Sequence, residues 1–139
     1  MTKLEQAKEL LESGKACCVI FRGEELLLEN GIGVKPLMKY LREDREFFAG
    51  AVVADKIIGK AAALLLSNAA EVYGSVMSET AQEVLDTYQV PYSCGERVPF
   101  IQNRTRTGMC PLEDAVRDIS DPAKGFDAIE ARIAELMRK

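Results

Sequence analysis

The spacing of apolar and polar residues predicts helices and strands in alternation along the chain. Leu4, Ala7 and Leu11 recur at helical spacing near the N-terminus, which predicts a first amphipathic helix. Segment 16–30 then predicts two strands joined around Gly23, because Gly-X is the expected residue pair of a type II′ hairpin turn. The chain therefore begins with a helix and a β-hairpin.

Beyond the hairpin, strand and helix patterns follow one another without a repeat or a linker. The predicted elements are a helix over 34–44, a buried central strand over 47–54, a helix over 60–68 and a strand over 71–77. A helix over 79–88, capped by Ser78 or Thr80, an edge strand over 97–103 and a loop over 103–108 come next. A helix over 110–119 follows, and a last helix has an apolar stripe at Phe126, Ile129, Ile133 and Leu136. This order predicts one domain over residues 1–139, with C-terminal helices from about residue 110. The expected fold class is α/β, a three-layer α/β/α arrangement around a mixed five-stranded sheet.

Composition narrows the functional classes. Apolar residues make up 47% of the 139 residues and charged residues 29%, which is typical of a globular domain. The net charge is −4, so no overall basic balance favours a nucleic-acid partner. The N-terminal segment mixes charges with leucines, unlike a signal peptide, and the longest apolar run, Ala61–Leu66, is too short to span a membrane. We expect a cytoplasmic protein with neither a membrane nor a nucleic-acid partner.

Cysteine and histidine content argue against a metal centre. The chain has four cysteines and no histidine, which removes the commonest zinc ligand and the commonest general base together. No two cysteines have Cys-x-x-Cys spacing, and the adjacent Cys17 and Cys18 point to opposite faces of a predicted strand. We expect reduced thiols, no metal and no cofactor.

Four short motifs carry a resemblance to a known group of proteins. GVKPL (33–37), DKIIGKAAA (55–63), NRTRTG (103–108) and CPLE (110–113) are similar to the pattern of a small uncharacterised family with a cytidine-deaminase-like fold that lacks the zinc site. Active members of that superfamily begin two helices with His-x-Glu or Cys-x-Glu and with Pro-Cys-x-x-Cys. The corresponding segments here are GKAAA (59–63), which has neither a ligand nor a general acid or base, and MSETAQE (77–83), which has no cysteine. The resemblance thus implies the fold but no activity, and zinc-dependent deaminase activity is not expected.

A lysine at the start of a predicted helix suggests an anion site. Lys60 falls in the first turn, where a cation costs ~0.3–1 kcal/mol against the helix dipole unless an anion binds there. The alternative is that Lys60 extends to solvent or pairs with Asp55 or Glu79. In the deaminase-like fold, the starts of the helices after the third and fourth strands border the pocket, so our first hypothesis is a binding protein for a small anionic, nucleotide-like metabolite. The expected ligand residues are Lys56, Lys60, Ser78, Glu79, Asn103 and Arg104.

The loop over 103–108 enters this list through its arginines and the resemblance. Arginine suits bidentate contacts to phosphate and carboxylate, and Arg106 matches a variable position of the family pattern. The alternative is a solvated loop whose arginines pair with acidic residues of the C-terminal helices.

Two further hypotheses come from other functional classes. Cys110 lies at a predicted helix cap before a proline, where the helix dipole stabilises a thiolate, so a thiol-dependent enzyme is one alternative. The nearby Glu113 opposes this, and the alternative, a buried structural cysteine that joins the loop to the helix, is the one that the sequence favours. The third hypothesis is a non-catalytic homodimer that associates through a sheet edge or through the C-terminal helices.

Overall fold

A computed structural model describes residues 2–31, 33–103, 105 and 107–138, and it contains one five-stranded sheet in the order β2-β1-β3-β4-β5. The strands are β1 (Cys18–Arg22), β2 (Glu25–Glu29), β3 (Val52–Ile58), β4 (Glu71–Ser78) and β5 (Tyr92–Val98). Strand β1 is antiparallel to both β2 and β3, whereas β3, β4 and β5 run parallel. The predicted mixed five-stranded sheet is confirmed.

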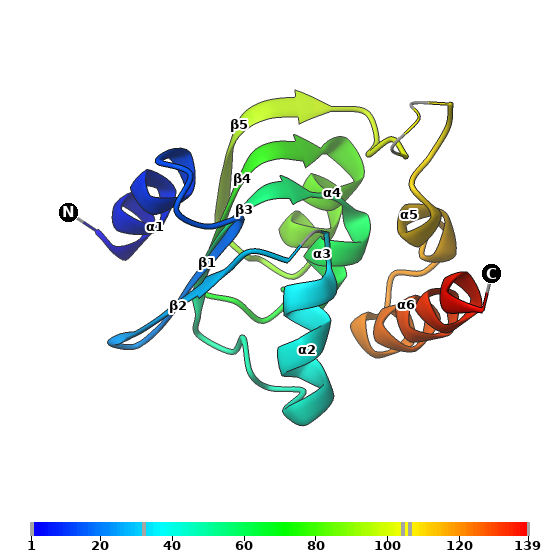
Figure 1. Ribbon diagram of the computed structural model, residues 1–139, viewed down its shortest axis with the longest axis horizontal. Helices are drawn as coiled ribbons and strands as arrows, with labels where there is room; N and C mark the ends of the chain where they lie inside the picture. Colours follow the sequence, from blue (N-terminus) through cyan, green and yellow to red (C-terminus); the bar gives the residue numbers. More distant parts are fainter. Residues whose placement is uncertain (1, 32, 104, 106, 139) are drawn as a thin grey trace.

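Helices cover both faces of this sheet. They are α1 (Lys3–Glu12), α2 (Lys35–Glu43), α3 (Lys60–Leu65), α4 (Glu79–Thr87), α5 (Pro111–Ala115) and α6 (Pro122–Met137). Helix α1 lies alone on one face, α2, α3 and α4 lie on the other, and α5 and α6 pack outside α3 (Figure 1). The α/β class is therefore confirmed.

Two apolar clusters separate along the two faces of the sheet. Under α1, Ala7 and Leu11 pack on Val19 and Ala54, as the spacing of the first helix predicts. The larger cluster lies between the sheet and α2 to α4. Its buried residues come from the sheet, from α2, α3 and α4, and from α6. Its largest members include Phe48, Leu37, Met38, Ile58, Leu64, Met77, Leu85 and Ile129.

Strand β3 starts later than the apolar run 47–54 predicts. Phe48 is fully buried but lies in the turn over 45–50, and Gly50 in that turn has a φ of 73°, outside the range of a strand. The strand then continues through Asp55 to Ile58. The apolar run is long because the turn contributes side chains to the same core as the strand.

The last strand also differs from its predicted range. Strand β5 covers Tyr92–Val98 instead of 97–103, so Cys94 lies within a strand and Pro99 just after it. Proline lacks the N–H that would continue the ladder, which explains the end of the strand at Val98. The predicted edge position is confirmed, since β5 ends the strand order.

Local turn and helix signals are reproduced more closely. The hairpin turns at Gly23, whose φ is 58°, while Glu24 has no positive φ, as a type II′ turn requires. Helix α3 starts at Lys60 as predicted but ends at Leu65, before the expected Asn68.

The last apolar stripe is only partly core. Phe126 and Ile129 are buried and Ile133 is partly buried, whereas Leu136 is 40% exposed.

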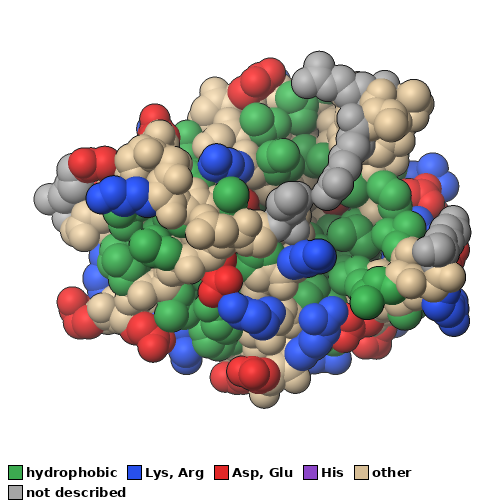
Figure 2. Space-filling model, viewed as in Figure 1, with side chains coloured by type: hydrophobic (Ala, Val, Ile, Leu, Met, Phe, Trp, Pro, Cys, Tyr) green, Lys and Arg blue, Asp and Glu red, His purple; other side chains and the backbone are tan. Residues whose placement is uncertain are grey.

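Charges of both signs are mixed on the surface. On the face shown in Figure 2, basic side chains lie close to acidic ones, and hydrophobic side chains reach the surface in separate patches. Within the described part of the chain, no helix combines the length and the apolar character needed to cross a bilayer.

Candidate functional site

The start of α3 is occupied by a carboxylate of the chain itself. The N–H groups of Lys60 and Ala61 donate to the two oxygens of Glu113, at 2.7 and 2.9 Å. These are orphan donors of the first helical turn, which have no partner within the helix. Glu113 belongs to α5, 53 residues further along the chain. The helix start that the sequence predicts to bind an anion therefore holds an internal one.

Glycine at position 59 is required by this contact. A Cβ built on Gly59 would lie 2.3 Å from the Glu113 Oε1 atom and 2.7 Å from the Ile101 Cγ1 atom. Both distances are below any ordinary van der Waals contact. Gly59 has a φ of −101°, so its role is to leave space and not to adopt a left-handed conformation. The segment around Ile101 thus passes directly over the start of α3.

Lys60 makes a second link between the same two helices. Its Nζ atom donates to the backbone oxygen of Arg117 at 2.8 Å, just after α5. Our alternative expectation, a pair with Asp55 or Glu79, is wrong. A cation at a helix C-terminus is favourable, so Glu113 and Lys60 each bind the helix end of opposite charge.

Burial dominates the electrostatics of Glu113. This side chain is 7% exposed, and loss of hydration raises its pKa above the ordinary value. The two backbone N–H groups and the nearby Lys60 ammonium lower the pKa and offset part of that effect. The contact is therefore sensitive to protonation of Glu113.

The neighbouring helix start, that of α4, is capped by Ser78. The Ser78 Oγ atom accepts the N–H of Ala81 at 3.0 Å and lies 2.9 Å from the Thr80 hydroxyl. The sequence predicts Ser78 or Thr80 as the cap, and in the structure the cap is Ser78. Ser78 is fully buried.

The other predicted ligand residues take different positions. Glu79 and Lys56 are exposed, the former in the first turn of α4 and the latter on β3. Asn103 is half-buried, and its side chain holds its own loop, since Oδ1 accepts the N–H of Thr107 at 3.0 Å. Arg104 and Arg106 lie outside the described residues.

Cys110 is the cap residue of α5, as predicted, but its side chain makes no capping hydrogen bond. Its N–H donates to the backbone oxygen of Ile101, which places it near the start of α3. The first turn of α5 carries Glu113 and Asp114, whose negative charges oppose a thiolate. The thiol-enzyme hypothesis stays a prediction that no described contact favours.

Neither of two surface hollows coincides with the predicted ligand residues. One of about 220 Å³ lies between α2, α3 and α6, where Arg45 stacks on Phe126, and the other, of about 270 Å³, lies beside α1. Among the described residues, no three acidic or thiol side chains are grouped so that they could hold a metal ion.

Sequence reasoning missed a second buried carboxyl group, that of Asp55 in the middle of β3. Asp55 is 6% exposed, and its Oδ2 atom has no hydrogen-bond partner in the part of the chain that the structure describes. Its register neighbours are Cys18 on β1 and Gly74 on β4. The predicted strand stops at Ala54, so no pattern in the sequence indicates that Asp55 lies inside the sheet.

Comparison with known proteins places the chain in one group. A family model described as TM1506, a domain of unknown function (DUF1893), matches residues 6–133. The crystal structure of a DUF1893 family protein (TM1506) from Thermotoga maritima is 24% identical and superposes with a TM-score of 0.83, covering 95% of this chain and 92% of that one. A search of curated proteins gave no significant match. At this level of identity, the similarity to that crystal structure shows the fold alone.

Proposed function

Because the chain belongs to the DUF1893 family, whose function is unknown, we propose a function from the site itself. The protein is a zinc-free binding protein of the cytidine-deaminase-like fold, and it binds a small anionic, nucleotide-like metabolite at the carboxyl ends of β3 and β4. The element order and the mixed sheet support the fold part of this proposal.

One observation supports an anion at this edge. The start of α3 already binds a carboxylate through two backbone N–H groups, with Gly59 leaving the space for it. Helix starts accept carboxylates and phosphates through the same donors. A ligand anion would replace Glu113 and would find the Lys60 ammonium beside it, while the exposed Lys56 lies on β3 near its carboxyl end.

Glu113 then acts as an internal competitor. Its carboxylate is desolvated, which raises its pKa, so its departure into water recovers hydration that burial removed. A ligand must still break the two hydrogen bonds and loosen α5. We therefore expect weak binding to the wild-type chain and tighter binding once Glu113 is shortened.

The test is a thermal-shift and calorimetric titration with cytidine and adenosine monophosphates and with inorganic phosphate. Glu113→Ala empties the helix start, and Asp118→Ala is the control, since it removes an exposed carboxylate elsewhere. A ligand at 100 times its dissociation constant stabilises the folded state by ~2.7 kcal/mol. We expect at least one probe to bind Glu113→Ala more tightly than wild type or Asp118→Ala.

Lys56 provides the second arm of the experiment. It is exposed, so Lys56→Ala leaves the fold intact and removes only a charge. In the Glu113→Ala background it should weaken binding of the same probe. The proposal is wrong if no probe shifts the melting temperature of any variant, or if Lys56→Ala leaves the affinity unchanged.

A further inference from the structure

Strand β2 has apolar residues at its centre, and among the described residues no other strand pairs with its outer edge. It stands at one end of the strand order, and its residues Leu26 and Leu28 are 42% and 45% exposed. The strand, Glu25–Glu29, contains neither proline nor lysine. Edge strands of this kind pair with another chain unless charge, proline or a bulge prevents it.

The opposite edge shows the usual protection. Strand β5 carries Gly95, Glu96 and Arg97 in succession, and Pro99 follows its end. All three residues within the strand are exposed. The two edges therefore differ, and only β2 has the character of a pairing surface.

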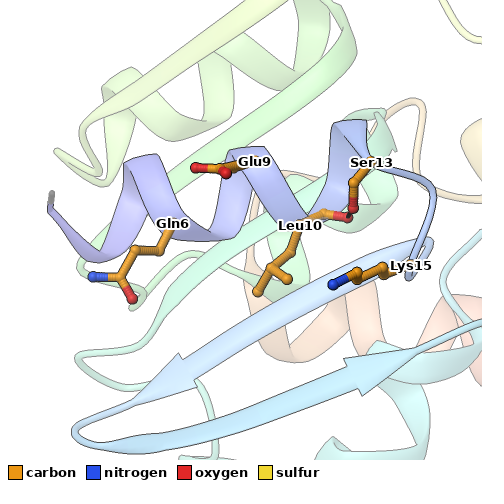
Figure 3. A pocket seen from close by; sticks show the side chains of 5 residues that line it. All are labelled: Gln6, Glu9, Leu10, Ser13 and Lys15. Carbon is orange, nitrogen blue, oxygen red and sulfur yellow. Dashed lines mark hydrogen bonds between the residues drawn. The ribbon is translucent and has the colours of Figure 1, made fainter.

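The exposed leucines lie on the α1 face of the sheet. Leu26 and Leu28 are in register with Phe21 and Val19, whose side chains pack beneath α1. The same side of the molecule carries the hollow of about 270 Å³, which is lined by residues of α1, by Ser13 and by Lys15 (Figure 3).

We infer that β2 pairs antiparallel with β2 of a second copy of this chain, about a two-fold axis at Leu27. The strand reads Glu-Leu-Leu-Leu-Glu in both directions, so Leu26 meets the partner's Leu28 and the reverse. Two-fold pairing covers the β2 edges of both copies and gives a closed dimer. Pairing of β2 with a different edge would leave one β2 edge free, and further copies could add to it. Self-complementarity of β2 therefore favours a second copy as the occupant.

Charges at the ends of the pairing limit its strength. Glu25 faces the partner's Glu29, and like charges directly opposite are unfavourable. Each carboxylate already has a cation: Arg22 lies 3.6 Å from Glu25, and Lys39 lies 3.0 Å from Glu29. Each end of the paired strands therefore holds two acidic and two basic groups. The contact between two five-residue strands is small, so we expect the fraction of dimer to depend on protein concentration.

The experiment is sedimentation velocity of the full chain over a wide concentration range, with three variants. The double variant Leu26→Lys/Leu28→Lys puts charges on the edge and should weaken dimerisation at least about tenfold. Glu25→Gln removes each Glu–Glu contact without adding a like charge beside Arg22 and should tighten it about threefold. Ile57→Lys is the control, because Ile57 is 49% exposed on β3, two strands from the β2 edge.

The outcomes separate the possible occupants. Dimers that weaken in the leucine variant, tighten in Glu25→Gln and stay unchanged in Ile57→Lys support the inference. A wild-type chain that stays monomeric at every concentration overturns it, as do open-ended oligomers. A dimer that ignores both edge variants uses another surface and overturns it as well. Circular dichroism of each variant confirms that the exposed substitutions leave the fold intact.

Discussion

Substitution of the buried Asp55 gives a prediction whose sign and size follow from the structure. Asp55 is 6% exposed, and burial raises the pKa of its carboxyl group to about 7. Hydrogen bonds from the Lys56 and Ile57 N–H groups and from the Cys18 thiol stabilise the carboxylate and lower the pKa, but they offset only part of the effect of burial. In the unfolded chain the same group titrates near 3.8. The folded state therefore binds a proton that the unfolded state releases between these two pH values.

Linkage gives the direction. Because the folded pKa is raised, stability from this group is fully present below pH ~4 and falls as the pH rises toward 7, where the loss is complete. Each pKa unit corresponds to ~1.4 kcal/mol, so the total is on the order of 4 kcal/mol as an upper bound. Asp55→Asn has no proton to lose at this position. Its stability relative to wild type should therefore increase by up to ~4 kcal/mol between pH 4 and pH 7.5.

The assay is urea denaturation of both proteins at several pH values, read as the difference in unfolding free energy at each pH. The difference is needed because burial also raises the pKa of Glu113, which adds a similar slope to both proteins. Asp118→Asn serves as the control, since Asp118 is exposed. Parallel pH profiles for Asp55→Asn and wild type would refute the reasoning, because a buried carboxyl that titrates normally carries no linked stability.

Three further substitutions test the packing around the site. Gly59→Ala puts a Cβ 2.3 Å from the Glu113 carboxylate and should cost ~1–3 kcal/mol in urea denaturation, whereas Gly108→Ala, with open space around it, should cost less; equal losses would contradict the close-contact argument. Ser78→Ala removes the α4 cap and should lower stability by ~1 kcal/mol, and an unchanged midpoint would show that the bond to Ala81 contributes nothing. Phe48→Ala should cost ~3–5 kcal/mol, measured the same way, and a loss under ~1 kcal/mol would place that ring outside the core.

Local signals in the sequence were sufficient for most of the fold. Gly23 predicts the hairpin turn, and the apolar run after Lys60 predicts the start of α3. The strand boundaries failed where apolar residues serve the core from outside a strand. Phe48 extends the apparent strand because a buried turn residue looks the same as a buried strand residue in sequence.

The candidate site was less accessible to sequence reasoning because its decisive contact is non-local. Nothing near Lys60 indicates that Glu113 caps α3, since the two lie 53 residues apart and the contact depends on how α5 packs. Periodicity reports which face of a helix is apolar, but it does not report which distant side chain meets the end of the helix. In the sequence, the only sign of this contact was the lysine at position 60, which is unfavourable at the start of a helix that has no partner.

The charge arrangement at α3 and α5 explains that lysine without a ligand. Lys60 at the positive end of α3 is unfavourable by ~0.3–1 kcal/mol on its own, but its ammonium reaches the negative end of α5, while Glu113 of α5 reaches the positive end of α3. Each helix thus supplies the counter-charge of the other. Glu113 and Lys60 are among the contacts that dock α5, together with the bonds from Arg132 of α6 to Pro111 and Asp114. Under the proposed function, an anion that takes the two N–H donors displaces Glu113 and removes one of these docking contacts. Ligand affinity and this contact would then be coupled through Glu113, and a substitution that weakens the contact should strengthen anion binding by up to the same free energy.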